Sequence, residues 1–316
     1  MNIIGKIRRF LGRKNKRDLL LSRMAMPLKH MVLRRKHGKR GLVYGLKTGE
    51  IVVSMTSYPK RFAGLPETLK SLLNQTVKPD GIVVYLDCGK EDLTPELLAM
   101  RRYGITFRFV AENLKAHLKY FHALRDFPGA LVITADDDMI YTDDLIETLV
   151  DSWRKHPDCV SARRVHRMEF RPDGSLKPYD DWTFECRSLK TPSDELVATG
   201  IGGVLYPPGV FDDRVFDGAA IREQCLGNDD IWLKWHELRL GIQVVWAPNG
   251  VVHPPVVESS QAVSLYGDNV GNRQNDLFIG TMQEKVFRFG RFPKNRPPPA
   301  CGAGRPLDGG PTAEGA

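Results

Sequence analysis

The chain has 316 residues, of which 42% are hydrophobic and 27% charged, proportions that are typical of globular proteins and exclude disorder over most of the chain. No segment approaches the roughly 20 consecutive apolar residues that a transmembrane helix needs, so a membrane-spanning protein is excluded. None of the five cysteines lies in a C-x-x-C pair, which excludes a disulfide scaffold or zinc ribbon and favours a reducing compartment.

The formal charge of +8 is concentrated at the N-terminus. Residues 1–40 contain 14 Lys and Arg and one acid, whereas the remainder contains 32 basic and 37 acidic residues. Apolar residues recur at helical spacing within 3–11, which is typical of a basic amphipathic helix on an anionic membrane surface. A solvated arm is the alternative, and nucleic acid is not expected, because residues for stacking are nearly absent. We predict a cytoplasmic protein. A membrane role of the arm would attach it to the inner face of the cell membrane.

Downstream of the arm, short apolar strands alternate with amphipathic helices. Strands are predicted at 51–55, 81–86, 105–110 and 130–134, and helices at 65–73, 96–102, 116–127 and 143–155. This alternation indicates an α/β protein with a mostly parallel sheet. Such sheets bind ligands at the carboxyl ends of their strands, so chemistry is expected in the segments that follow them.

Three consecutive aspartates follow the fourth predicted strand. In an extended segment, Asp136 and Asp138 lie on one side and Asp137 on the other. Two carboxylates on one face repel each other unless a cation lies between them, and Mg²⁺ or Mn²⁺ binds carboxylate and phosphate oxygens together. Capping of the next helix is the alternative. An assignment of the protein as an enzyme would fail if these side chains turned away from any cleft or were already neutralised by arginines.

Further motifs follow in an order typical of a known family. The first strand continues into TSYPKR at Thr56–Arg61, and SLLNQTVKP follows at Ser71–Pro79. After the aspartates come a glycine pair in 202–208 and the acidic dipeptide of Asn228–Trp232. Over residues 50–255 the chain resembles GT-A-type, family 2-like nucleotide-sugar glycosyltransferases, and is most similar to bacterial enzymes that build surface polysaccharide or the lipopolysaccharide core.

The resemblance implies a GT-A fold, which is a Rossmann-like, mostly parallel sheet flanked by helices, with a smaller acceptor-side subregion. Segment 160–195, rich in polar and aromatic residues, resembles that subregion. The expected parts are a basic arm (1–45), a transferase domain (46–290) with a nucleotide-binding half (46–142) and an acceptor half (143–290), and a disordered tail (291–316).

The resemblance also implies a metal site and a nucleotide-sugar site. Asp138 and Asp136, completed by His253, would bind Mn²⁺ or Mg²⁺. The residues expected beside the nucleotide sugar are Thr56, Ser57, Tyr58, Arg61, Asp87, Lys119, Asp137, Gly202 and Gly203. Open alternatives are ordinary surface ion pairing for Arg61, Asp87 and Lys119, a structural or surface role for His253, and a simple turn for the glycines.

The acidic dipeptide opens a predicted helix. Asn228 is a good N-cap, and Asp229 and Asp230 complement the positive end of the helix dipole, so a structural role alone would explain them. By resemblance, Asp230 would be the general base that takes the proton of an acceptor hydroxyl, with Asp229 as second candidate.

The function implied is metal-dependent transfer of a hexosyl or N-acetylhexosaminyl group from a nucleoside-diphosphate sugar, most often a UDP-sugar, to a glycan or glycolipid hydroxyl. A base opposite the leaving group favours inversion. Two alternatives stay open. A sugar-nucleotide pyrophosphorylase would carry a glycine-rich loop after the first strand, where this chain has no glycine until Gly64. A non-catalytic protein would act through the basic arm on a membrane or nucleic acid.

Overall fold

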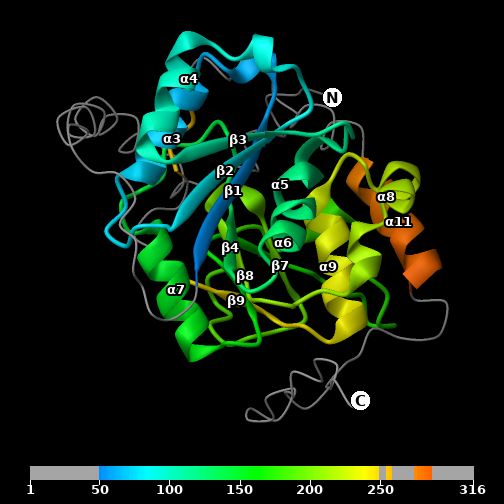
Figure 1. The fold of residues 1–316 in the computed structure, drawn as a ribbon. Helices are drawn as coiled ribbons and strands as arrows, with labels where there is room; N and C mark the ends of the chain where they lie inside the picture. The colour runs from blue at the N-terminus through cyan, green and yellow to red at the C-terminus, as the bar shows by residue number, and fades with distance from the viewer. Residues whose placement is uncertain (1–49, 249–253, 258–273, 287–316) are drawn as a thin grey trace, which may run out of the picture.

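A seven-stranded sheet in the order β3-β2-β1-β4-β8-β5-β9 forms the centre of the computed structural model (Figure 1). The structure describes residues 50–248, 254–257 and 274–286, so the predicted arm, the predicted tail and His253 lie outside the described residues. The strands of the sheet are β1 (Ile51–Ser57), β2 (Gly81–Leu86), β3 (Ile105–Phe109), β4 (Leu131–Thr134), β5 (Val160–Ala162), β8 (Val204–Tyr206) and β9 (Val244–Trp246). A separate pair is formed by β6 (Val165–Arg167) and β7 (Leu196–Ala198).

Helices cover both faces of the sheet. Figure 1 shows α3, α4 and α7 on one side, and α5, α6, α8, α9 and α11 on the other. Their bounds are α3 (Leu65–Leu73), α4 (Pro95–Met100), α5 (Leu118–Phe121), α6 (Ala123–Asp126), α7 (Leu145–Lys155), α8 (Gly218–Gln224), α9 (Asp229–Leu240) and α11 (Gln274–Val286). Every helix in the described part of the chain is too short or too polar to cross a bilayer.

The pairing within the sheet is mostly parallel. β3, β2, β1 and β4 are parallel neighbours, β5 and β9 are parallel to each other, and β8 pairs antiparallel with both β4 and β5. β8 therefore runs against the other six strands. The predicted fold class is confirmed. The sheet is also continuous across residue 142, the predicted boundary between the two halves, and that division stays a prediction.

The side-chain alternation of β1 separates two cores. Ile51, Val53 and Met55 pack with the buried leucines of α3 and α7, whereas Val52 packs on the opposite face with side chains of α5 and α9. Both faces are apolar because helices cover both, which is the usual arrangement for a parallel sheet. The sheet is thus held rigidly at its centre, where β1 and β4 lie side by side.

The predicted helix over 116–127 is the clearest difference from the sequence analysis. The structure has a 3-10 turn at Lys115–His117, then α5, and α6 after a break at His122. The ring of His122 stacks on Tyr85 of β2, with the ring centroids 5.1 Å apart. The prediction of one continuous helix over this range did not reveal the break at His122.

Candidate active site

Asp137 lies at the carboxyl end of the central strands and is held from β1. Ser57 Oγ donates to Asp137 Oδ2 at 2.6 Å, and an Arg61 guanidinium nitrogen donates to Asp137 Oδ1 at 2.6 Å. Thr68 Oγ1 donates to the Asp137 carbonyl at 2.9 Å. Burial raises the pKa of Asp137, and Arg61 opposes that rise. Asp137 therefore joins the segment after β1 to the segment after β4.

The neighbouring carboxylates have different partners. The same Arg61 nitrogen lies 3.1 Å from Asp138 Oδ2, and Lys119 Nζ donates to Asp136 Oδ1 at 2.7 Å. Burial and the nearby Asp136 carboxylate raise the pKa of Asp138 to about 6, although Arg61 acts against the rise. Asp138 is therefore a poorly hydrated carboxyl group that also lies near a second carboxylate.

Lys119 of α5 connects the triplet to a distant part of the chain. Its side chain is buried, and its Nζ lies 2.7 Å from Asp136 Oδ1 and 3.0 Å from Asp229 Oδ2. Burial alone would lower the pKa of Lys119, but the surrounding carboxylates raise it well above its ordinary value. Lys119 is therefore a charged ammonium group between the strand-end aspartates and the first turn of α9.

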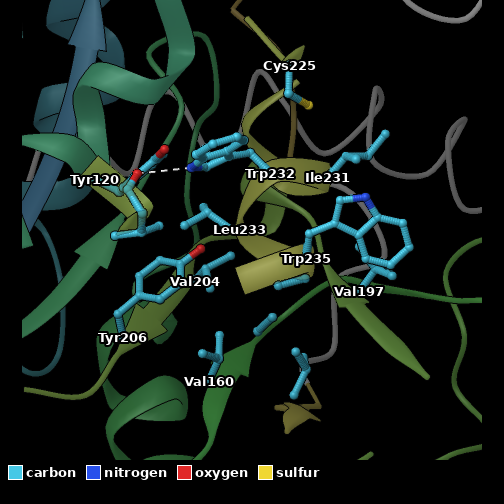
Figure 2. Close-up of a cluster of buried hydrophobic side chains, with 14 of the residues drawn as sticks. Tyr120, Val160, Val197, Val204, Tyr206, Cys225, Ile231, Trp232, Leu233 and Trp235 are labelled. Carbon is cyan, nitrogen blue, oxygen red and sulfur yellow. Dashed lines mark hydrogen bonds between the residues drawn. The ribbon is translucent and has the colours of Figure 1, made fainter. Parts of the chain in front are cut away.

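Helix α9 positions the second acidic pair. The Asn228 side chain caps the helix by accepting from the Ile231 N–H at 2.9 Å. Figure 2 shows the next turns of α9 within a buried cluster, with Leu233 on the side of Val204 and Tyr206 of β8 and Trp235 on the side of Val197 of β7. The Trp232 indole N–H donates to the Val215 carbonyl at 3.0 Å. The first turn of α9 is thus anchored by both a cap and a packed core.

The two carboxylates of this turn differ in their electrostatics. Burial opposes ionisation of Asp229, but Lys119 outweighs it and lowers the pKa of that carboxyl. Burial and the Asp229 charge raise the pKa of Asp230 to about 8. The Gly200 N–H donates to Asp230 Oδ1 at 3.0 Å and orients it. Of the pair, Asp230 is the better proton acceptor near neutral pH, because its pKa lies closer to that pH.

Gly200 lies two residues before the predicted glycine pair, Gly202 and Gly203. A Cβ at Gly200 would lie 2.7 Å from Lys119 Nζ and 3.2 Å from Asp136 Oδ1, so a side chain at this position would force the ammonium group to shift. A Cβ at Gly202 would instead meet the Arg164 Cβ at 2.7 Å, and one at Gly203, whose φ is +86°, would meet Leu145. Of the three glycines, Gly200 is therefore the one that borders the Lys119 ammonium group.

The remaining predicted residues lie around this cluster. Thr56 Oγ1 donates to the Tyr85 carbonyl at 2.9 Å, and the Arg61 guanidinium lies over the Tyr58 ring at 5.6 Å. Asp87 is half-buried directly after β2, at the edge of the sheet where β1 also ends. Arg61 and Lys119 are therefore both paired within the protein, and their place beside the nucleotide stays a prediction.

The donor set fits a divalent cation that is shared with a ligand. No group of three His, Cys, Asp or Glu side chains among the described residues forms a metal centre by itself, but Mg²⁺-type sites need only one or two carboxylates when phosphate oxygens contribute. Arg61 neutralises Asp137 and contacts Asp138, so the triplet is partly neutralised. Asp136 and Asp138 remain suitable, because within the described part of the chain the five carboxyl groups of this site lie near two cations, Lys119 and Arg61.

The sequence around this site is similar to that of a known protein family. Residues 53–203, just under half of the chain, match the model described as "Glycosyl transferase family 2", a segment that contains most of β1, the aspartate triplet and Gly200. The predicted resemblance to this family is confirmed over that segment. The match supports a glycosyltransferase in general. Comparison with curated proteins gives no match.

Solved structures with similar chains include three that differ in activity. One is described as the mannosyltransferase PcManGT from Pyrobaculum calidifontis in complex with GDP-Man and Mn²⁺, at 16% identity, covering 86% of this chain and 74% of that one, with a TM-score of 0.48. Another is CMP:2-keto-3-deoxy-manno-octonic acid synthetase complexed with CTP. It is 11% identical, and the match covers 72% of this chain and 98% of that one, with a TM-score of 0.42. The third is GalNAc-T7 with UDP, GalNAc and Mn²⁺. It is 11% identical, and the match covers 73% of this chain and 48% of that one, with a TM-score of 0.44.

Proposed function

We propose that the protein is a metal-dependent, inverting glycosyltransferase. It transfers a hexosyl or N-acetylhexosaminyl group from a nucleoside-diphosphate sugar, with UDP as the first nucleotide to test, to a hydroxyl of a glycan or glycolipid. The observation that carries the proposal is the Lys119 ammonium group, which holds Asp136 at the strand end and Asp229 at the start of α9. The donor side and the proton acceptor Asp230 are thereby brought to one place.

In the proposed reaction, the acceptor hydroxyl oxygen forms the new bond to the anomeric carbon. The bond from that carbon to the diphosphate oxygen breaks, and the leaving nucleoside diphosphate keeps the electron pair. The proton of the hydroxyl passes to the Asp230 carboxylate, which the Gly200 N–H orients at 3.0 Å. Attack from the side opposite the leaving group inverts the anomeric configuration.

Asp136 and Asp138 would hold the divalent cation, Mn²⁺ or Mg²⁺. When bound, such an ion stabilises the negative charge that develops on a departing diphosphate. The closeness of Asp138 to the Asp136 carboxylate supports this assignment, because a cation between two carboxylates offsets their repulsion. Arg61 orients Asp137 and Asp138 through its guanidinium group.

Nucleotide titration with matched variants tests the proposal. Isothermal titration of UDP, GDP and CDP with and without Mn²⁺ should show binding of one nucleotide that requires the metal. Asp138→Asn should abolish the metal-dependent binding of the nucleotide. Asp143→Asn, which changes an exposed carboxylate on the same segment, should leave that binding unchanged. Metal-independent binding, or equal loss in both variants, would contradict the proposal.

The stereochemistry of the product tests the role of Asp230 separately. We expect a product of inverted anomeric configuration, measured by proton NMR of the first-formed glycoside. Retention would rule out direct displacement with Asp230 as base, while leaving the nucleotide and metal assignments intact.

We also propose that the basic segment 1–40 attaches the enzyme to anionic membranes, on the strength of its 14 basic residues. Deletion of this segment should spare turnover of a soluble acceptor and reduce sedimentation with phosphatidylglycerol vesicles. Loss of turnover on the soluble acceptor would indicate that the segment is part of the catalytic unit.

A further inference from the structure

The segment between β4 and α7, residues 135–144, carries the three aspartates and has little regular structure. Apart from a single bridge at Met139, it forms neither helix nor strand, and yet Met139, Ile140 and Tyr141 are buried. The backbone N–H and C=O groups of a buried segment need hydrogen-bond partners, which a helix or a sheet would normally supply. The groups that bind this backbone therefore also fix the positions of the aspartates.

Polar side chains on one side of α3 bind the segment. Thr68, Ser71 and Gln75 are spaced by three and four residues, which places them along one side of the helix and of the turn that follows it. All three side chains are buried, and a buried polar group is destabilising unless it is hydrogen-bonded. Ser71 and Gln75 belong to the SLLNQTVKP motif, to which the proposed reaction assigns no role.

Ser71 holds the segment at Tyr141. Its hydroxyl accepts from the Tyr141 N–H at 3.1 Å and donates to the Thr68 carbonyl at 2.6 Å. The Tyr141 hydroxyl in turn accepts from the Asp136 N–H at 2.7 Å. The backbone of Tyr141 is thus bound by α3, while the end of its side chain binds the backbone of the first aspartate.

Gln75 holds the segment where it enters α7. Its Nε2 donates to the Ser71 carbonyl at 3.0 Å and to the Thr142 carbonyl at 2.8 Å, and its Oε1 accepts from the Ile146 N–H at 3.1 Å. Within the described part of the chain, the N-cap residue Asp144 makes no side-chain cap hydrogen bond to α7. Gln75 therefore supplies an acceptor to the first turn of α7 from outside the helix.

A second segment, 254–257, also binds this backbone. The Val257 N–H donates to the Asp138 carbonyl at 2.7 Å, and the Ile140 N–H donates to the Pro255 carbonyl at 2.8 Å. The backbone at Asp138 is therefore fixed before any ligand binds. A site that is already ordered binds its ligand more tightly, because less conformational freedom is lost on binding.

We propose that Ser71, Gln75 and Tyr141 are positioning residues for the divalent cation, an inference that rests on the proposed transferase function. They hold the backbone from the first aspartate to the start of α7, and so they keep the carboxylates of Asp136 and Asp138 where one cation binds both. They act through these aspartates and not on the sugar. Residues that hold metal ligands in place commonly contribute about ten- to hundredfold to the affinity for the metal.

Tyr141→Phe tests the inference, because it removes one hydroxyl and keeps the buried ring. Electron paramagnetic resonance of free aqueous Mn²⁺ measures metal binding by the full chain, in the presence of whichever of UDP, GDP and CDP the wild-type protein binds. We expect Tyr141→Phe to bind Mn²⁺ about tenfold more weakly than the wild type. Ser71→Ala, which removes the acceptor of the Tyr141 N–H, should weaken Mn²⁺ binding to a similar degree.

Tyr85→Phe is the matched control. Tyr85 is a buried tyrosine in the core on the other face of the sheet, and its hydroxyl donates to Asp126 Oδ2 at 2.7 Å. This variant also loses one hydroxyl hydrogen bond, so its melting temperature without metal should fall about as far as that of Tyr141→Phe. Its affinity for Mn²⁺ should equal that of the wild type. Equal weakening of Mn²⁺ binding in Tyr85→Phe would attribute the effect to lost stability and overturn the inference.

The same titrations distinguish this inference from the proposed function. Unchanged Mn²⁺ affinity in Tyr141→Phe, or in Ser71→Ala if Tyr141→Phe does not fold, would overturn the positioning role and leave the proposed function intact. If the wild-type protein binds none of the three nucleotides in a metal-dependent way, the proposed function itself is wrong, and the positioning role is wrong with it.

Discussion

The ammonium group of Lys119 is buried between carboxylates that are distant in sequence. It contacts Asp136, 17 residues away, and Asp229 on α9. Lys119→Met keeps most of the side-chain volume but leaves these carboxylates without their cation. Because a buried charge without its partner costs about 3–5 kcal/mol, we expect a loss of that order in the free energy of unfolding, measured by urea denaturation.

The matched control is Lys115→Met, an exposed lysine four residues earlier. Surface substitutions of this kind change stability by about 0.5 kcal/mol or less. Similar losses for both variants would show that the Lys119 ion pairs do not stabilise the fold.

The raised pKa of Asp230 predicts a pH dependence for the transfer step. Its pKa is raised to about 8 by burial and by Asp229, and a general base acts only when it is ionised. The rate should therefore increase with pH up to about 8 and then level off, in a profile of kcat/KM on a soluble acceptor. A rise in kcat/KM near the ordinary pKa of aspartate would exclude Asp230 as the base. A pH profile that is unchanged in Asp230→Asn would exclude it as well.

Residue types and motif order indicated which side chains could lie at the strand ends, but the pairing among them could not be predicted. The structure pairs Arg61 with Asp137 and Lys119 with Asp136, and the place of both beside the nucleotide stays a prediction. A sequence pattern shows which residues lie at strand ends. It does not show which lysine fills the space above Gly200, because that depends on contacts between segments more than 80 residues apart.

At the scale of elements, the cap of α9 joins helix stability to the geometry of the site. Asn228 accepts from the Ile231 N–H through Oδ1 and donates to Asn275 through Nδ2. Asn228→Ala removes both bonds and should destabilise the protein by about 1 kcal/mol, as loss of a cap does. Asn228→Asp keeps the cap oxygen but loses the bond to Asn275.

Comparison of these two variants by thermal unfolding and by turnover separates the cap from the contact with α11. We expect Asn228→Asp to be nearly as stable as the wild type while turnover falls, because Asn275 no longer fixes the cap. Full turnover in Asn228→Asp would show that the contact with α11 is dispensable.

The alternation of apolar strands and amphipathic helices predicted β1 to β4 and their parallel pairing, because β1, β2 and β4 are buried on both faces and β3 alternates apolar and polar residues. The three-residue strands β5 to β8 were not predicted, since three residues are too few to show a periodicity. The direction of β8 could not be predicted either. It depends on the path of the whole 160–203 segment, which has little regular structure of its own.

At the scale of the whole molecule, a buried histidine links stability to pH. His117 is fully buried, with Nδ1 2.9 Å from the Tyr120 hydroxyl and Nε2 2.9 Å from the Cys225 carbonyl. The carbonyl can only accept, so Nε2 carries the proton and the Tyr120 hydroxyl donates to Nδ1. Burial lowers the pKa of His117 to about 4.

The unfolded chain, where the pKa of histidine is about 6.5, therefore binds the proton more readily than the folded protein. Stability is highest above pH 6.5 and decreases as the pH falls toward 4. Between pH 7 and pH 5 the contribution of His117 to this loss is about 2 kcal/mol. Urea denaturation at the two pH values measures it. His117→Gln should show a smaller difference between them, and an equal difference would assign the effect to other groups.

The negative charge around Asp230 serves the proposed activity but lowers the stability of the folded protein. The folded protein holds a proton on this carboxyl that the unfolded chain releases at neutral pH, and that is a cost of folding. Asparagine at position 230 would avoid that cost and still accept the Gly200 N–H. Selection for thermal tolerance alone would therefore enrich inactive variants at this position, and directed evolution of a hardier catalyst needs an activity screen in every round.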